Sequence, residues 1–571
     1  MGQRCHDDRD DDLAASVRNG GQILRDQLLI NKTDLAFCVP GESFLAVIDA
    51  LRDVEDRLPL MTCRHEASAA NMAEAYGKLT GRPGVAFVTR GPGATQASVG
   101  VHTAAQDSTP MILFVGLIKR GHRGREAFQE INLASMFQGM AKWATEITET
   151  DRIPETVSRA FAVALGGRPG PVVVGLPEDM LSETSVVPDA RTAPVARAEP
   201  SPGQVASVHQ LLASARRPLA IIGGGRWTAR ASADWAAFAS ANDLPTVTSF
   251  RRQDYLDNAS EQYVGVLGLG TDPALVRRVG EADLLLAVGC RLGDITTAGY
   301  TLLDVPEPRQ RLVHVHPDVG ELGRVYRPEL AINADTPAFV AHLRSLPPVT
   351  APPWAQWRAE ARADYLRFSQ PVAWSRGVDL GHVIGCLRQR LPADAVVTNG
   401  AGNYTVWVHR YHQYRSFRTQ LAPTSGAMGY GIPAAIAAKA ADPERTVVAF
   451  AGDGCFLMAG SELATAMQYD LPILVVVVNN QMLGTIRMHQ ERAAPGRPYA
   501  TSLTNPDFAS YARSFGAFGE QVTDNASVAA ALDRALTAGR PAVLELLTDP
   551  ERLTPDASIT GIGSAAQGAT A

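Results

Sequence analysis

Two oxygen-bearing side chains end two consecutive apolar segments near the C-terminus of the chain. Asp453 lies in the turn "AGDGCF", and Asn480 closes "PILVVVVNNQ" 27 residues further on. A carboxylate, an amide oxygen and a backbone carbonyl such as that of Met482 suit a hard cation, and Mg2+ bound in this way keeps places for phosphate oxygens and water. Gly452 and Gly454 would let the backbone approach a phosphate closely. The pattern therefore predicts a cation site beside a phosphate group.

Two simpler interpretations of the Gly-Asp-Gly turn are a plain loop and a fragment of an EF-hand. The EF-hand is excluded because Cys455 and Leu457 stand where oxygen ligands would be needed. A plain loop accounts for Gly-Asp-Gly alone, but not for a double asparagine at this distance after a second apolar segment.

The elements that must position these side chains are two buried strands and a crossover. Residues 446–451 ("TVVAFA") and 472–478 ("PILVVVV") are typical of buried strands, and residues 459–468 of the helix between them. A right-handed crossover brings the carboxyl ends of both strands to one edge of a parallel sheet. We therefore expect Asp453 and Asn480 side by side at that edge, where such sheets bind ligands.

The same order of apolar strand, glycine and amphipathic helix recurs along the whole chain, which favours an α/β fold with three doubly wound parallel-sheet domains. Two Pro-rich stretches, at about 184–203 and at 346–353, are typical of linkers. The expected boundaries are a disordered tail at 1–15, a first domain at 16–185, a middle domain at 204–345, a last domain at 370–552 and a C-terminal tail at 553–571.

Composition narrows the class of protein. The chain has 571 residues, 46% of them apolar and 20% charged, with a net charge of −6. The absence of a basic excess argues against nucleic-acid binding. The six cysteines show no C-x-x-C spacing and are expected to be reduced thiols of a cytoplasmic protein. No stretch approaches the roughly 20 apolar residues of a membrane span, and the acidic start is unlike a signal peptide.

The spacing from Asp453 to Asn480 resembles the cofactor motif of the thiamine diphosphate (thiamine pyrophosphate) enzymes, which begins with GDG and ends with NN. The segment "RHEASAANMAEAYGKLTGRPGVAFVTRGPGATQ" resembles the pyrimidine-binding domain of acetolactate synthase and its relatives, and the resemblance runs from about residue 20 to 550. It implies thiamine diphosphate and Mg2+ as cofactors. It also implies pyrimidine-binding, middle and diphosphate-binding domains in that order.

Glu66 is the acid that this resemblance singles out. Taken alone, it is a carboxylate at the start of an Ala-rich helix, where the helix dipole favours it. In the family, the matching glutamate bonds the aminopyrimidine ring and exchanges a proton with its nitrogen, which helps to remove the C2 proton of the thiazolium. A poorly solvated glutamate with a raised pKa suits this exchange, while the cofactor carries the rest of the chemistry.

Further contacts follow by the same resemblance. "TNGAGNYTVW" matches the segment that holds the diphosphate, and "TSGAMGYGIPAA" matches the turn beneath the cofactor, where Met428 props the bend between the rings or is ordinary core. The resemblance assigns cofactor binding to Glu66, Asn403, Tyr404, Gly426, Met428, Gly452, Asp453, Gly454, Asn480, Met482 and Leu483, and metal binding to Asp453, Asn480 and Met482. Since the family's cofactor lies between subunits, it also implies a homodimer or homotetramer.

The substrate side departs from the acetolactate synthase pattern. Phe128 and Gln129 stand where that family lines its substrate pocket, and Gln129 is taken as catalytic. His489 replaces a tryptophan and is a second catalytic candidate. His102 is another candidate proton shuttle, but a structural role is favoured over a catalytic one for either histidine. Several basic residues near the expected cleft favour an anionic small-molecule substrate. These basic residues are Arg487, in place of an apolar residue, Arg90, in place of a small one, and Lys119, Arg120, Arg123 and Arg125 on the nearby loop. Glu42 lies on a loop that borders the cofactor in the family and is another, weaker candidate site residue.

The sequence of the middle domain gives only weak evidence of nucleotide binding. Its "IIGGGRWT" breaks the G-x-G-x-x-G fingerprint at Thr228. Arg291 is kept, but Gly293 and Ile295 replace polar positions of the family's FAD-binding pattern. Members of the family bind FAD, ADP or nothing in this domain, and FAD is therefore possible here but not favoured.

The sequence is compatible with three functions. The first is an acetolactate synthase-like carboligase or decarboxylase that acts on a 2-oxo acid and passes the acyl fragment to a proton or a second carbonyl. The alternative is a thiamine diphosphate-dependent lyase or decarboxylase of an acyl-CoA or a hydroxy ketone. The third is a non-catalytic oligomer that has kept the fold, which the retention of Glu66, Asp453 and Asn480 disfavours.

Overall fold

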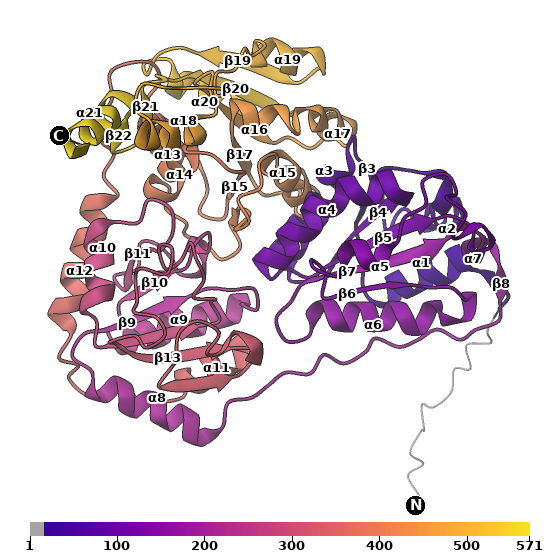
Figure 1. Cartoon of the computed structure of the whole chain (residues 1–571), viewed down its shortest axis with the longest axis horizontal. Coiled ribbons are helices and arrows are strands. Elements are labelled where there is room, and N and C mark those ends of the chain that lie inside the picture. Colours follow the sequence, from indigo (N-terminus) through magenta and orange to yellow (C-terminus); the bar gives the residue numbers. More distant parts are fainter. Residues whose placement is uncertain (1–15, 571) are drawn as a thin grey trace, which may run out of the picture.

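The computed structural model describes residues 16–570 and contains three six-stranded parallel sheets, which confirms the predicted α/β class with three doubly wound units (Figure 1). The predicted tail at 1–15 lies outside the described residues. Each sheet is built from short, buried, β-branched strands covered by helices on both faces, as continuous apolar strands require.

The first sheet has the order β3-β2-β4-β5-β7-β6. Its strands are β2 (Ala36–Cys38), β3 (Leu60–Thr62), β4 (Gly84–Thr89), β5 (Met111–Leu117), β6 (Trp143–Glu146) and β7 (Pro171–Pro177). Helices α1 (Gly20–Ile30), α2 (Leu45–Arg52) and α6 (Ile153–Leu165) share a core with one face. The other face carries α3 (Glu66–Thr80) and α4 (Arg90–Asp107).

The last sheet has the order β16-β15-β17-β18-β20-β19. Its strands are β15 (Val396–Asn399), β16 (Gln420–Leu421), β17 (Val447–Gly452), β18 (Leu474–Asn479), β19 (Phe518–Val522) and β20 (Ala542–Leu547). Helices α13 (Leu380–Arg390), α14 (Tyr404–Tyr411) and α20 (Val528–Leu536) cover one face. On the other face, α15 (Gly431–Ala441) packs against α3, so one continuous core joins the first and last sheets (Figure 1).

The middle sheet has the order β11-β10-β9-β12-β13-β14. Its strands are β9 (Pro218–Ile222), β10 (Thr246–Thr248), β11 (Tyr263–Val266), β12 (Leu284–Val288), β13 (Arg311–His316) and β14 (Leu330–Asn333). Helices α8 (Pro202–Ser214), α9 (Ala229–Ala241) and α11 (Thr336–Arg344) lie on one face, and α10 (Pro273–Glu281) and α12 (Ala355–Phe368) on the other. The predicted linker at 346–353 contains no helix or strand, and the one at 184–203 contains none between β8 (Thr184–Ser185) and the start of α8.

Local details differ from the predictions in two places. The crossover after β17 is not one helix over 459–468, but α16 (Asp453–Leu457), a 3-10 turn η6 (Gly460–Glu462) and α17 (Leu463–Gln468). The segment expected as a C-terminal tail forms β21 (Arg552–Thr554), β22 (Ala557–Ser558) and α21 (Ile559–Thr570). Helix α21 contacts α18 (Gly484–Ala493), and its small residues lack the apolar period that would have revealed it.

None of the helices within residues 16–570 has the length and apolar character needed to cross a membrane. All five cysteines in this part of the chain are free.

Candidate active site

The strands β17 and β18 bring Asp453 and Asn480 to the same sheet edge. The two strands pair in parallel with Gly452 opposite Val478, so the residues that follow both strands emerge together. Asp453 begins α16 directly after β17, and Asn480 follows the last residue of β18. The crossover between the two parallel strands thus places both side chains at one edge, as the sequence predicts.

A cavity of about 270 Å³ opens at this edge. Its lining includes every predicted cofactor contact except Glu66: Asn403, Tyr404, Gly426, Met428, Gly452, Asp453, Gly454, Asn480, Met482 and Leu483. Sequence reasoning missed Trp374 and Asp549, which also line the cavity and are joined by a hydrogen bond from Trp374 Nε1 at 3.1 Å. Both lie outside the recognisable motifs, so no local signal pointed to them.

The carboxylate of Asp453 is 3% exposed and takes part in no salt bridge among the described residues. Its Oδ1 accepts a hydrogen bond from the Gly454 N–H, and its Oδ2 accepts one from Asn505 Nδ2, both at 2.8 Å. Burial raises the pKa of Asp453, and the hydrogen bonds to its two oxygens offset this effect only in part. A divalent cation would supply the missing positive charge. The residues present therefore fit a metal ion held by Asp453.

Few other side-chain oxygen atoms near Asp453 could bind a cation. Asn480 Oδ1 accepts a hydrogen bond from the Met482 N–H at 3.3 Å, which folds the chain back beside the cavity. Asn505 was not predicted from the sequence, and its buried Oδ1 has no partner in the described structure. No group of three or more His, Cys, Asp or Glu side chains within residues 16–570 could hold a metal elsewhere.

Glycines leave room for a ligand's phosphate groups against the backbone. Gly402 has a φ of +141°, and a Cβ there would lie 2.8 Å from Tyr404 Cε1. A Cβ on Gly454 would lie 2.9 Å from Leu483 Cδ2. Side chains at these positions would collide with the cavity wall, so backbone faces the space where a diphosphate is expected.

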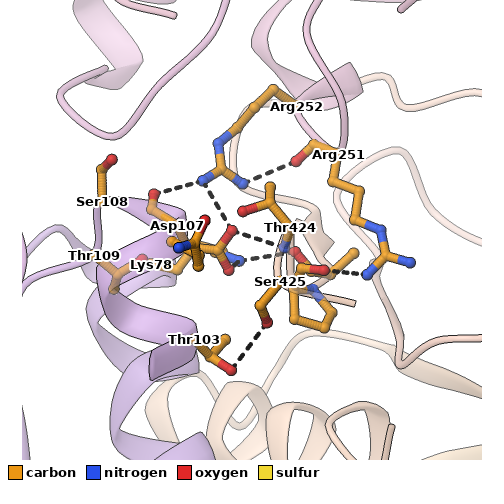
Figure 2. A network of polar contacts seen from close by, with 12 residues as sticks. Lys78, Thr103, Asp107, Ser108, Thr109, Arg251, Arg252, Thr424 and Ser425 are labelled. Atoms are coloured by element: carbon orange, nitrogen blue, oxygen red, sulfur yellow. Dashed lines mark hydrogen bonds and ion pairs between the residues drawn. The ribbon is translucent and has the colours of Figure 1, made fainter. Parts of the chain in front are cut away.

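The turn that carries Gly426 is held by charged side chains of the two other domains, as Figure 2 shows. Asp107 accepts a hydrogen bond from the Thr424 N–H at 2.8 Å, and Lys78 donates to the Ala422 carbonyl at 2.9 Å. Arg251 of the middle domain donates to the Pro423 carbonyl. The geometry beneath the cavity therefore depends on all three domains.

Asp107 is the centre of this network. Its side chain is fully buried beside Lys78 and has Arg252 at 3.7 Å (Figure 2). Burial alone would raise the pKa of Asp107, but the two cations lower it to about 2. Arg251 adopts a left-handed φ of +60°, which a side-chain-bearing residue adopts only where its surroundings impose it.

Glu66 does not line the cavity of its own chain. It begins α3 as a half-buried residue, with His65 as the N-cap. The loop before it contacts the last domain through a hydrogen bond from the Arg64 N–H to Glu462 at 3.0 Å. The single chain thus separates the predicted acid from the predicted metal site.

The predicted substrate-side residues fall into different places. Phe128 is 74% exposed, and Gln129 has a φ of +65° and a buried Oε1 without a partner in the described structure. Arg90 pairs with Glu42 at 3.0 Å and with Glu178 at 3.1 Å. Other predicted basic residues are also paired with acids: Lys119 with Glu178, Arg120 with Asp179 and Glu183, Arg123 with Glu146, and Arg487 with Glu491.

A second cavity, of about 920 Å³, lies at the junction of the three domains. It shares Gly402, Asn403, Gly426 and Thr485 with the first cavity, so the two cavities adjoin. His102 and His489 both line it. So do Arg251, Arg291 and Arg492, for which the described residues provide no salt bridge. The same lining includes the acid Asp294. On the loop at 119–125, Lys119, Arg120 and Arg123 are paired with acids, and Arg125 has no salt bridge among the described residues.

The glycine-rich turn of the middle domain is used for packing. Gly224 has a φ of +85°, and a Cβ there would lie 1.8 Å from the Gly289 carbonyl oxygen. Trp227 Nε1 donates to the Gly223 carbonyl at 2.7 Å, and Thr228 caps α9. This close approach of two loops accounts for Gly224 without a bound dinucleotide.

Comparison with known proteins matches each of the three units. The C-terminal TPP binding domain of thiamine pyrophosphate enzymes matches residues 400–546, the N-terminal TPP binding domain residues 18–136, and the central domain residues 205–343.

Relatives align over almost the whole chain. The acetolactate synthase isozyme 2 large subunit of Escherichia coli K12 is 32% identical over 93% of this chain and 96% of its own. The acetolactate synthase large subunit of Parasynechococcus marenigrum is 32% identical over 93% and 88%. A probable acetolactate synthase large subunit of Methanocaldococcus jannaschii is 29% identical over 94% and 93%. The resemblance predicted from the sequence is confirmed: the chain belongs to the thiamine pyrophosphate enzymes and is similar to the large subunits of acetolactate synthase.

Proposed function

We propose that this chain is a thiamine diphosphate- and Mg2+-dependent enzyme that decarboxylates a 2-oxo acid, ligates the acyl fragment to a second carbonyl compound, or does both. The observation that carries the proposal is the cavity at the end of β17 and β18. It gathers the buried, unpaired Asp453 with Asn480 and with the backbone that the resemblance assigns to the diphosphate.

The chain's own residues have separate tasks. Asp453 and Asn480, with the Met482 carbonyl, would hold Mg2+ against the diphosphate. Met428 and the Gly426 backbone would support the aminopyrimidine. The cofactor, when bound, supplies the carbanion chemistry at C2. No part of this proposal requires FAD in the middle domain.

Glu66 would act as the acid–base residue on a cofactor held by a second copy of the chain. Support comes from the position of Glu66 outside its own cavity, on a domain other than that of Asp453. The proposal therefore includes a homodimer or a homotetramer with active sites between subunits. A cytoplasmic location is proposed from the cysteines, since those described are free thiols.

The substrate is proposed to be a small anion. Arg251, Arg291 and Arg492 line the larger cavity and keep their charge without an acidic partner, so they would attract a carboxylate. His489 and Gln129 are the proposed residues beside the reacting carbon, as the family resemblance suggests.

A second candidate is a lyase or decarboxylase that acts on an acyl-CoA or a hydroxy ketone. The volume of about 920 Å³ favours it, because that space exceeds what a small 2-oxo acid fills.

Product analysis with the holoenzyme tests the first proposal against the second. The protein is incubated with pyruvate alone, then with other 2-oxo acids and with acyl-CoA donors. Acetolactate from pyruvate supports the synthase reaction, and turnover of an acyl-CoA with inertness toward every 2-oxo acid favours the lyase. If calorimetry shows no binding of thiamine diphosphate with Mg2+, both enzyme proposals are wrong and a non-catalytic oligomer is the better account.

A further inference from the structure

Glu462 lies where the last domain meets the helix that carries Glu66. It ends η6, nine residues after Asp453, and is 0% exposed. Its Oε1 and Oε2 both accept the Arg64 N–H, at 3.0 and 3.3 Å, and Oε2 also accepts from the Thr465 hydroxyl. A side chain of the last domain thus holds the backbone of the first domain two residues before Glu66.

Neighbouring contacts fix the same loop. The Thr62 N–H donates to the Tyr469 hydroxyl at 2.7 Å, and the Arg64 guanidinium donates to Gln468 Oε1 at 2.6 Å. Both partners lie on α17 or just after it. The loop between β3 and α3 is therefore bonded at several points to the segment that follows the Asp453 turn.

The carboxylate of Glu462 lies at the N-terminus of α3. The first backbone N–H groups of a helix have no partner within it, and the helix dipole favours a negative group there. Burial raises the pKa of Glu462, while its hydrogen bonds to Thr465 and to the Arg64 N–H favour the ionised form. No salt bridge among the described residues involves it, so directional hydrogen bonds are its contribution.

We propose that Glu462 is a positioning residue, which fixes the first turn of α3 so that the Glu66 carboxyl is aimed at the aminopyrimidine of the cofactor held by a second copy of the chain. The inference rests on the function proposed for Glu66. It adds that, within one chain, the segment after the Asp453 turn holds the loop before Glu66 through the buried contact of Glu462 with the Arg64 N–H.

Exchange of the cofactor's C2 proton tests this without knowledge of the substrate. Holoenzyme with thiamine diphosphate and Mg2+ is diluted into D2O, quenched with acid, and the C2 proton is followed by NMR. In Glu462→Ala the Arg64 N–H loses its acceptor, and we expect exchange to slow by about a hundred-fold, the effect of a misplacement of about 1 Å. Glu462→Gln keeps one carbonyl oxygen and should slow exchange less. Cofactor affinity, measured by calorimetry, should change little in both variants.

Gln468→Ala is the matched control, because it removes the neighbouring bond from the Arg64 side chain and leaves both bonds to Glu462. Its exchange rate should stay near that of the wild type. If it falls as far as Glu462→Ala, general loosening of the interface explains the effect and the inference is wrong. If Glu462→Ala does not fold, the Gln variant decides, and exchange at the wild-type rate overturns the inference. A wild-type protein that binds no cofactor, or exchanges no faster than free thiamine diphosphate, contradicts instead the proposed function itself.

Discussion

The two ends of the proposed active site are built differently. The metal end is complete within one chain: Asp453 is 3% exposed, and ten predicted cofactor contacts share its cavity. The acid end has Glu66 at the start of α3, half-buried and outside that cavity. The metal end is thus specified by strand ends and glycines, whereas the acid end depends on contacts between domains and, in our proposal, between copies of the chain.

The largest expected effect is at the acid end. Glu66→Gln should lower turnover and C2 proton exchange by about 10²–10⁴, the usual effect of losing a positioned acid–base group. Cofactor binding should persist, because the metal end is intact. The exposed carboxylate of Glu55 on the same domain gives a control, and Glu55→Gln should behave as wild type. Wild-type exchange in Glu66→Gln would remove Glu66 from the site.

Substitution in the polar network around Asp107 tests whether the metal end depends on the other two domains. Asp107→Asn leaves Arg252 buried without its carboxylate and leaves Lys78 with only Glu74, at 3.5 Å. We expect the free energy of unfolding to fall by about 3–5 kcal/mol, measured by denaturant titration. Glu329→Gln, which breaks a half-exposed pair with Arg311, should cost no more than about 1 kcal/mol. Equal small losses in both variants would show that the network does not join the domains.

A smaller effect is expected for the metal ligand. Thiamine diphosphate with Mg2+ should stabilise the wild type by about 2.7 kcal/mol at a hundred times the dissociation constant. Asp453→Asn should lose most of this stabilisation at the same concentrations and recover part of it with excess Mg2+, since the carboxylate carries most of the ligand charge. Melting curves with and without the cofactors measure both. An equal cofactor-induced shift in the two proteins would show that Asp453 is not the metal ligand.

The contrast between the two ends also explains what the sequence could predict. The Asp453 turn and Asn480 follow two apolar strands that are consecutive in the chain, so crossover geometry alone placed them together. Trp374 reaches the same cavity, and Asn505 reaches the Asp453 carboxylate, from loops with no periodic signal. The basic loop at 119–125 suggested an anion site, but acidic partners distant in sequence neutralise several of its members. Ion pairs between side chains that are distant in sequence cannot be predicted from the composition of one segment.

The central claim is that Glu66 of one chain serves the metal end of another, and subunit mixing tests it most directly. Glu66→Gln and Asp453→Asn proteins, each nearly inactive alone, are unfolded together, refolded and assayed for C2 proton exchange. In a mixed dimer one of the two sites would combine an intact Glu66 with an intact Asp453, so random pairing predicts recovery toward about a quarter of the wild-type rate. If both residues acted within one chain, every site in the mixture would carry a substitution. Mixed dimers without recovered exchange would contradict the account.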